Sequence, residues 1–312
     1  MSIRYLDIQR MSSEDGPGLR TTVFFKGCSL ACRWCHNPES ISPAIEMQWL
    51  GERCIGCGTC QAACPNGAVS LCVEGVFIDE TACARCGACR EACPTCAMTQ
   101  KGTDVPFDQL ALELYKDRAY FGADGGVTLS GGEALLQSDS IPLLRQLKKM
   151  GLHTAVDTCG LVPNYRLLQA LGHTDVLLYD VKIFDPVRHR AFTGQSNELI
   201  LNNLSLAADW AKHGGRLWVR TPIIPIATDF EANIEAIGRL LHRLGGVERW
   251  ELIAFNNLCR DTYRRMQRDW EYENTPLVTK QRMETLLFTA RATGGCPDTR
   301  ITGATRQEAD IP

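Results

Sequence analysis

The chain has 312 residues, with 45% apolar residues, 22% charged residues and a net charge of −3. This length allows one large domain with a smaller one inserted or appended. Because charges of both signs are scattered, the composition argues against a nucleic-acid-binding protein. The N-terminus lacks a signal-peptide pattern and no apolar run could cross a bilayer, so we expect a cytoplasmic protein without membrane partners.

The predicted elements divide the chain into three parts. Residues 1–50 contain one predicted buried strand, Arg20–Phe25, rich in β-branched and aromatic residues. Residues 51–100 are rich in cysteine, glycine and proline, and something other than hydrophobic burial has to hold them together. In residues 101–312 short apolar runs alternate with helical patterns, which predicts βαβ units and a parallel sheet.

About six strands are predicted in all. Besides the first, they are Val127–Leu129, His153–Val156, Val176–Val181, Leu217–Ile224 and Trp250–Phe255, with predicted helices that include Ile141–Met150 and Ile234–Leu244. Six strands are too few for a closed eight-stranded barrel, so we expect an α/β fold with an open or partial barrel. Ligands of such folds bind at the carboxyl ends of the strands.

Three cysteines follow the first predicted strand with the spacing C-x₃-C-x₂-C: Cys28, Cys32 and Cys35. Three thiolates can hold three irons of a [4Fe–4S] cluster and leave the fourth iron open to a small molecule. The alternative is a zinc site that lacks its fourth ligand or takes it from His36. Disulfides are not expected among the 16 cysteines of a cytoplasmic chain.

Residues 51–100 contain two copies of the bacterial ferredoxin run C-x₂-C-x₂-C-x₃-C-P. In two-cluster ferredoxins the fourth cysteine of each run binds the other cluster. We therefore assign one cluster to Cys54, Cys57, Cys60 and Cys93, and a second to Cys83, Cys86, Cys89 and Cys64. The remaining cysteines are expected to be small buried residues: Cys72, Cys96, Cys159, Cys259 and Cys296.

Glycines and charged residues end several predicted strands. Gly131 and Gly132, which precede Glu133, would let the backbone approach a ligand closely. Candidate polar contacts at other strand ends are Asp157, Thr158, Asp180, Lys182 and Arg220. The alternatives are an ordinary strand–helix turn for the glycines and a structural ion pair for the charged residues.

The cysteine triad, with aromatic Trp34 before its last cysteine, resembles the signature of the radical S-adenosylmethionine (SAM) superfamily. The resemblance implies that the open iron binds SAM and that one electron cleaves it to methionine and a 5′-deoxyadenosyl radical. Residues expected to carry catalysis are Cys28, Cys32, Cys35 and Lys182. Those expected around SAM are Trp34, Gly131, Gly132, Glu133, Asp157, Thr158, Asp180, Lys182, Arg220 and Asn256.

Further motifs resemble one branch of this superfamily, the activating enzymes of glycyl radical enzymes. They are Asp15–Thr21, Phe25–Cys28, Cys35–Glu39, Gly126–Glu133, Asp157–Gly160, Asp180–Lys182 and Phe192–Gly194. The resemblance implies that the radical removes a hydrogen from a backbone glycine in the C-terminal glycyl loop of a partner enzyme, with flavodoxin or ferredoxin as electron donor. In some members, residues that match Asp157, Thr158 and Asp180 also hold a monovalent cation.

The chain departs from the branch at two places. Ala134 stands where proline usually follows the glutamate, and Phe255–Cys259 replaces a Tyr-His-x-Leu-Gly stretch. Asn256 can still donate a hydrogen bond there, but a role that requires imidazole is unsupported. The Arg-rich, aromatic segment Arg260–Thr275 would either shape partner docking or be a solvated loop.

Several functional questions stay open at this stage. The two ferredoxin-type clusters, which bring the expected total to three, would either relay electrons or only fold the insert. A radical SAM enzyme that acts on a small molecule or peptide is the second functional hypothesis. A pure electron carrier is the third, and it leaves the triad and the Gly-Gly-Glu turn unexplained.

Overall fold

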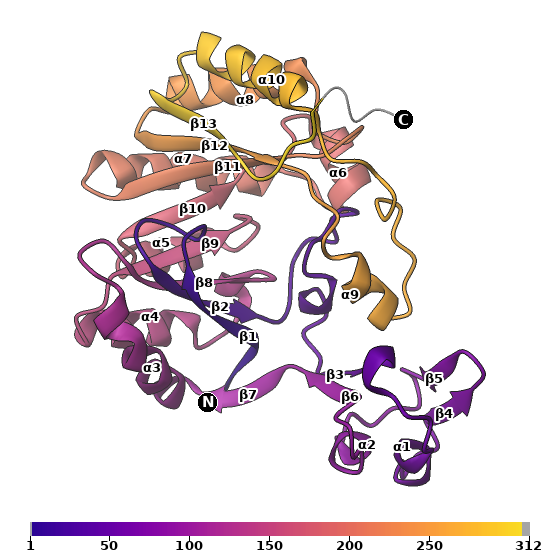
Figure 1. Cartoon of the computed structure of the whole chain (residues 1–312). Coiled ribbons are helices and arrows are strands. Elements are labelled where there is room, and N and C mark those ends of the chain that lie inside the picture. Colours follow the sequence, from indigo (N-terminus) through magenta and orange to yellow (C-terminus); the bar gives the residue numbers. More distant parts are fainter. Residues whose placement is uncertain (1, 308–312) are drawn as a thin grey trace.

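The structure, a computed structural model, describes residues 2–307, and in this range nine strands form one mixed sheet (Figure 1). Its order is β13-β12-β11-β10-β9-β8-β2-β1-β7. From one edge to β2 the neighbours pair in parallel: β13 (Asp298–Thr302), β12 (Val247–Ala254), β11 (Arg216–Ile223), β10 (Val176–Asp180), β9 (Thr154–Thr158), β8 (Gly126–Gly131) and β2 (Arg20–Phe25). β1 (Ser2–Ser12) and β7 (Thr103–Pro106) continue the sheet antiparallel.

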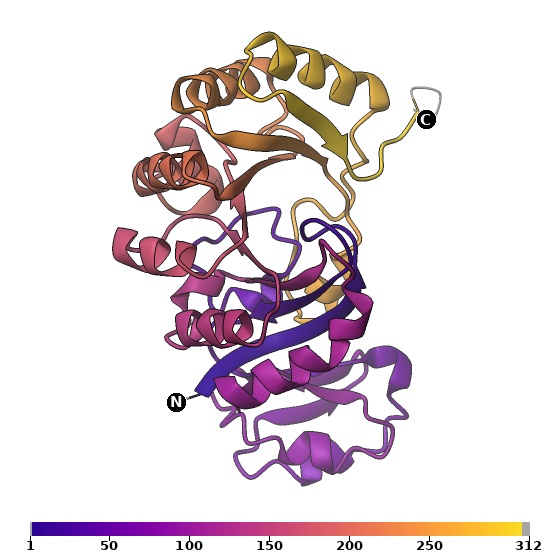
Figure 2. The same ribbon diagram turned by 90° about the vertical axis from the view of Figure 1, so that its left-hand side faces the viewer.

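The helices that connect the parallel strands form a layer along one side of the sheet (Figures 1 and 2). Neighbours in this layer contact each other in the order α3 (Phe107–Tyr115), α4 (Ser140–Lys149), α5 (Asn164–Leu171), α7 (Glu198–Lys212), α8 (Glu231–Leu244) and α10 (Lys280–Ala292). Outside this layer, the described part of the main body also contains α6 (Pro186–Thr193) and α9 (Arg260–Arg265). The sheet stays open, which confirms the predicted α/β fold and agrees with a partial barrel.

The six predicted strands are present, with ends that shift by a few residues, but the estimate of six was too low. β13 was missed because its sequence, Asp-Thr-Arg-Ile-Thr, is that of a polar edge strand with little apolar pattern. β1 was missed because two irregularities in its pairing with β2 interrupt the alternation of buried and exposed side chains. Within residues 2–307 no helix is both long and apolar enough to span a bilayer.

Residues 46–101 form a small lobe inserted between β2 and β8, below the main body in both views (Figures 1 and 2). β3 (Glu46–Trp49) pairs with β6 (Met98–Lys101) at the neck of the lobe, and β4 (Val69–Cys72) pairs with β5 (Gly75–Ile78). These strands and the one-turn helices α1 (Thr59–Ala62) and α2 (Ala88–Glu91) are too short to produce a period in the sequence.

The apolar core of the lobe is small, and cysteines belong to it. Its buried apolar residues are Cys60, Val69, Val76, Cys89 and Met98. Hydrophobic burial on this scale does not hold a lobe of this size, as the sequence indicated. The expectation that the unassigned cysteines are all buried was wrong for Cys72, at the end of β4, and for Cys96, in the bend before β6, which are both exposed; Cys159, Cys259 and Cys296 are buried.

We expect Gly238→Ala to destabilise the protein by about 1–3 kcal/mol through overpacking. Helix propensity alone would predict a gain of about 1 kcal/mol. The loss is expected because a Cβ on this α8 residue would lie 2.2 Å from Thr293 Oγ1, just after α10. Urea unfolding checks the sign, with Arg239→Ala on the exposed side of the same turn as the control. A stabilised Gly238→Ala variant would contradict the close packing of α8 on the end of α10.

Candidate active site

A cavity of about 310 Å³ opens at the carboxyl ends of the parallel strands, a volume suited to a small molecule. Residues at the ends of β2, β8, β9, β10, β11 and β12 all contribute to its wall. Among the predicted site residues, those that line it are Cys28, Cys32, Trp34, Cys35, Gly131, Gly132, Asp157, Thr158, Asp180, Lys182 and Arg220. Glu133 and Asn256 are not part of this wall.

The loop after β2 carries the three cysteines and is held against the end of α6. The N–H of Ala31 donates to the carbonyl of Thr193 at 2.9 Å, and that of Arg33 donates to Phe192 at 3.0 Å. Trp34 is buried, with its ring centroid 6.2 Å from that of Phe192. These contacts turn the cysteine loop toward the cavity.

Two of the three thiols need a cationic partner to ionise, whereas a hydrogen bond with Cys159 lowers the pKa of Cys28. Burial raises the pKa of Cys32 to about 12 and also raises that of Cys35, so a thiolate forms here when a cationic partner such as iron is bound. Within residues 2–307 no three His, Cys, Asp or Glu side chains converge on one point as ligands of a single ion. Cys28, Cys32 and Cys35 all line the cavity, where each could bind a different iron of a cluster.

Gly131 and Gly132 bring β8 unusually close to the cysteine loop. A Cβ on Gly131, whose φ is +115°, would lie 2.1 Å from the nitrogen of Phe25. One on Gly132 would lie 2.3 Å from the carbonyl oxygen of Gly27. The close approach lets the N–H of Gly132 donate to Phe25 at 2.9 Å and that of Glu133 to Gly27 at 2.8 Å. The glycines are therefore needed for packing within the chain as well as for an open wall.

Glu133 is fully buried behind the cavity wall. Its carboxylate accepts hydrogen bonds from the Thr158 hydroxyl at 2.8 and 2.9 Å, from the Cys159 N–H at 2.9 Å and from the Leu135 N–H at 3.1 Å. Burial raises the pKa of Glu133, although these hydrogen bonds oppose the rise. The carboxylate joins the turn after β8 to the end of β9.

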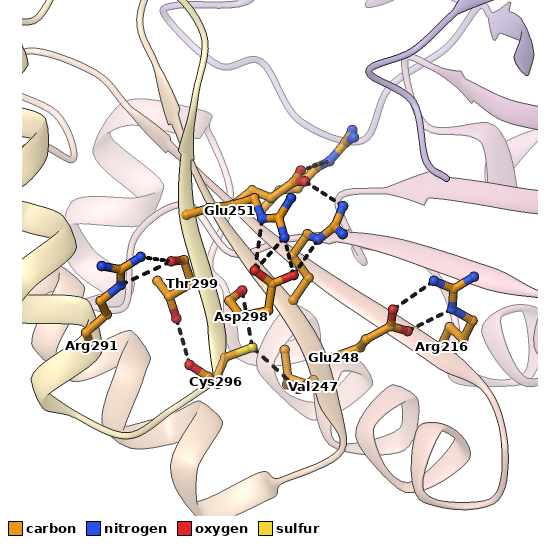
Figure 3. Close-up of polar contacts among 11 residues, drawn as sticks. Arg216, Val247, Glu248, Glu251, Arg291, Cys296, Asp298 and Thr299 are labelled. Atoms are coloured by element: carbon orange, nitrogen blue, oxygen red, sulfur yellow. Dashed lines mark hydrogen bonds and ion pairs between the residues drawn. The ribbon is translucent and has the colours of Figure 1, made fainter. Parts of the chain in front are cut away.

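Arg220 on β11 belongs to a series of ion pairs that runs from the partly exposed Asp298 to the cavity. Its guanidinium lies 3.7 Å from Asp157 and 3.2 Å from Glu251. Glu251 lies 3.6 Å from Arg249, which pairs at 2.9 Å with Asp298 on the edge strand β13 (Figure 3). These ion pairs fix the position of Arg220 in the wall of the cavity.

Asp157 and the ion pair of Asp180 with Lys182 complete the charged wall. Burial raises the pKa of Asp157 to about 6, with Arg220 opposing the rise and Asp180 adding to it. Burial would lower the pKa of Lys182, but the negative charge of Asp180 is the largest influence that opposes it, and this pKa is raised above its ordinary value. Carboxylates and cations side by side in a buried wall suit a ligand that carries both an amino and a carboxylate group.

The structure adds residues that sequence reasoning missed. Phe255 lines the cavity where Asn256 does not, and its ring centroid lies 6.0 Å from that of His36. Asn256 instead accepts a hydrogen bond from the N–H of Leu258 at 3.2 Å. Asp15 also lines the cavity, although its motif suggested no role for it. An apolar residue at a strand end, such as Phe255, carries no sequence signal that separates a cavity wall from the core.

Each predicted cysteine quartet of the inserted lobe surrounds its own small cavity. One cavity is lined by Cys64, Cys83, Cys86 and Cys89, and the other by Cys54, Cys57, Cys60 and Cys93. The fourth cysteine of each run thus lies with the first three of the other run.

The two runs share the same local geometry. In each run a glycine with positive φ, Gly58 or Gly87, precedes a one-turn helix. In each a backbone N–H then donates to the fourth cysteine at 3.3 Å, from Ala68 to Cys64 and from Ala97 to Cys93. This repeat supports a pair of equivalent sites.

Comparison with known families finds sequence matches along much of the chain. The radical SAM superfamily matches residues 85–236, a 4Fe-4S binding domain matches residues 47–70, and a 4Fe-4S single cluster domain matches residues 14–55.

Two curated relatives are similar over most of their length. The (2S)-3-sulfopropanediol sulfolyase activating enzyme of Bilophila wadsworthia (strain 3_1_6) is 39% identical over 272 residues, which cover 86% of this chain and 89% of that one. The trans-4-hydroxy-L-proline dehydratase activating enzyme of Clostridioides difficile is 34% identical over 284 residues, covering 89% and 93%.

Among solved structures, Streptococcus suis SuiB bound to its precursor peptide SuiA is similar with a TM-score of 0.50. The sequences are 10% identical, and the match covers 65% of this chain and 43% of that one. At this identity the likeness concerns the fold alone.

Glu133→Gln should destabilise the protein by about 1–3 kcal/mol, because the new amide NH₂ faces N–H and O–H donors and leaves one of them unsatisfied. The measurement is the urea midpoint of identically loaded proteins. Glu74→Gln, on an exposed turn of the lobe, is the control and should leave the midpoint unchanged. Equal midpoints for the two variants would show that the buried carboxylate does not join β8 to β9.

Proposed function

The chain belongs to the activating enzymes of glycyl radical enzymes within the radical SAM superfamily, and we propose that its strand-end cavity is where SAM binds and is cleaved. This membership agrees with the motifs read from the sequence. When bound, the cluster and SAM supply a 5′-deoxyadenosyl radical, which takes a hydrogen from a backbone glycine of the partner enzyme. The observation that carries the proposal is that residues from six strand ends and the cysteine loop line one cavity.

The residues of the wall have separate roles in this proposal. Cys28, Cys32 and Cys35 hold the SAM cluster. Lys182 and Arg220 provide positive charge for the SAM carboxylate, while Asp157 and Asp180 accept hydrogen bonds from its amino group or ribose hydroxyls. Trp34 excludes water at one side of the cavity, and Gly131 and Gly132 leave room for the ligand. Asp157, Thr158 and Asp180 are also the proposed position of a monovalent cation.

Residues 51–100 hold two further [4Fe–4S] clusters in this proposal, which makes three in the chain. Each quartet of thiols surrounds one cavity, and the lobe has too small an apolar core to fold on its own. Ferredoxin-type clusters suit electron transfer at low potential, so we assign them the relay of electrons from flavodoxin or ferredoxin to the SAM cluster.

The partner is a glycyl radical enzyme whose C-terminal glycyl loop reaches the cavity. The named relatives activate a sulfolyase and a dehydratase, so family membership alone does not select one partner. In this proposal residues 1–50 carry the cysteine loop, residues 51–100 supply electrons, and residues 101–312 provide the SAM wall. No two cysteines of residues 2–307 form a disulfide bond, as is usual in the reducing cytoplasm, the compartment that we propose for the protein.

Cys32→Ala should abolish SAM cleavage, because the SAM cluster loses one of three ligands. Anaerobically reconstituted protein, dithionite and SAM are incubated, and 5′-deoxyadenosine is quantified. Iron content should fall from roughly twelve to roughly eight per chain. Cys296→Ala removes a buried cysteine near β13 and should leave both values unchanged (Figure 3). Absence of product from fully loaded wild-type protein would refute the function.

A second experiment tests the crossed pairing of the insert cysteines. The double variant Cys57→Ser/Cys93→Ser should lose roughly four irons, no more than either single variant, because both residues serve one cluster. Cys57→Ser/Cys64→Ser should lose roughly eight irons, because these residues serve different clusters. The reverse result would mean that each run binds its own cluster.

A further inference from the structure

The segment of residues 257–275, called here the bridging segment, is attached to the cysteine loop. The hydroxyl of Tyr263 donates to the carbonyl of Cys35 at 3.0 Å, and the indole N–H of Trp270 donates to the carbonyl of Arg33 at 3.0 Å. The two rings are buried and stack, with centroids 4.9 Å apart and an interplanar angle of 9°. The segment is therefore not the solvated loop that one sequence alternative described.

Between these two aromatic residues, the same segment is attached to the inserted lobe. The amide of Gln267 donates to the carbonyl of Val76 at 2.9 Å. Arg265 pairs with Glu52 at 3.2 Å, and Arg268 pairs with Glu46 at 3.3 Å and with Glu80 at 3.6 Å. Figure 1 shows α9 lying between the main body and the lobe.

Glu46 connects three parts of the molecule. Its second carboxylate oxygen lies 2.7 Å from the ammonium of Lys26, which is fully buried two residues before Cys28. Burial lowers the pKa of Lys26, and Glu46 opposes this shift. Lys26, Glu46 and Arg268 thus join the end of β2, the neck of the lobe and the bridging segment.

The bridging segment also lies next to both cysteine quartets. Met266 and Gln267 face a small gap whose other wall includes Met47, Trp49 and Ile78. Met47 and Ile78 also line the cavity of Cys64, Cys83, Cys86 and Cys89. Trp49 also lines the cavity of Cys54, Cys57, Cys60 and Cys93. A single layer of side chains therefore separates the segment from either quartet.

We propose that the bridging segment positions the inserted lobe against the cysteine loop, and so sets the rate at which electrons reach the SAM cluster. In this step one electron leaves a reduced cluster of the lobe and enters the SAM cluster, and no bond or proton changes place. A low-potential carrier of the flavodoxin or ferredoxin class replaces the electron. Arg265, Gln267 and Arg268 are positioning residues, and the inference rests on the three-cluster function proposed above.

The test compares two double variants that remove equal charge. Arg265→Gln/Arg268→Gln breaks the ion pairs to the lobe. Arg260→Gln/Arg264→Gln is the matched control, because Arg260 is exposed and Arg264 pairs with Asp261 and Glu273 inside the segment. Each loaded protein is assayed for 5′-deoxyadenosine with dithionite and with reduced flavodoxin. Hydrogen exchange of residues 74–80 reports docking of the lobe independently of activity.

For Arg265→Gln/Arg268→Gln we expect unchanged iron content, unchanged cleavage with dithionite and faster exchange in residues 74–80. Cleavage with reduced flavodoxin should fall about tenfold, as expected when three ion pairs no longer favour the docked lobe. The control should match wild type in every measurement. If the variant loads less iron, Gln267→Ala, which removes one hydrogen bond to the lobe, provides the same comparison.

Two outcomes would overturn the inference. Equal losses with both reductants would mean that the segment only supports the SAM site. An unchanged flavodoxin rate with faster exchange would mean that docking of the lobe does not limit electron delivery. Wild-type protein that fails with dithionite would instead refute the proposed function itself, so the two failures are distinguishable.

Discussion

The parallel pairing of β2 with β8 is the constraint on which the whole site depends. The inserted lobe separates these strands in sequence, yet their pairing continues past the strand ends through the bonds from Gly132 to Phe25 and from Glu133 to Gly27. The cysteine loop and the Gly-Gly-Glu turn are therefore one hydrogen-bonded unit. The carboxylate of Glu133 extends this unit to Thr158 on β9. Three strand ends are thus fixed before a ligand arrives, as a preorganised site requires.

The charged wall is built on that rigid edge. Ionised groups are costly to bury alone, and each one here has a partner: Arg220 has Glu251 and Asp157, while Lys182 has Asp180. Asp298, the ion-pair partner of Arg249 and the residue of this series farthest from the cavity, lies on the polar edge strand β13 (Figure 3). A strand with little apolar pattern thus contributes to the order of the site at a distance.

The sequence could predict features that depend on residues close together along the chain, but not features that depend on contacts between distant residues. The cysteine runs and the charged strand ends follow local spacing, so they could be named from the sequence. Phe255 in the cavity wall and the stack of Tyr263 on Trp270 depend on packing between residues far apart in the chain. The residues around Cys72 and Cys96 gave no local signal that separates an exposed cysteine from a buried one. The buried role of Glu133 likewise required knowing that β9 lies beside β8.

The narrow neck of the lobe has an evolutionary consequence. The lobe leaves and re-enters the main body through one antiparallel pair, with Glu46 opposite Lys101. Removal of residues 46–101 would interrupt no strand of the main sheet, so such a module can be gained or lost by a single genetic event. Arg265 and Arg268 would then lose their partners in the lobe. The lobe and the bridging segment, which are remote in sequence, should therefore change together in evolution. Covariation between Arg265 or Arg268 and their partners in the lobe should mark lineages that kept the lobe.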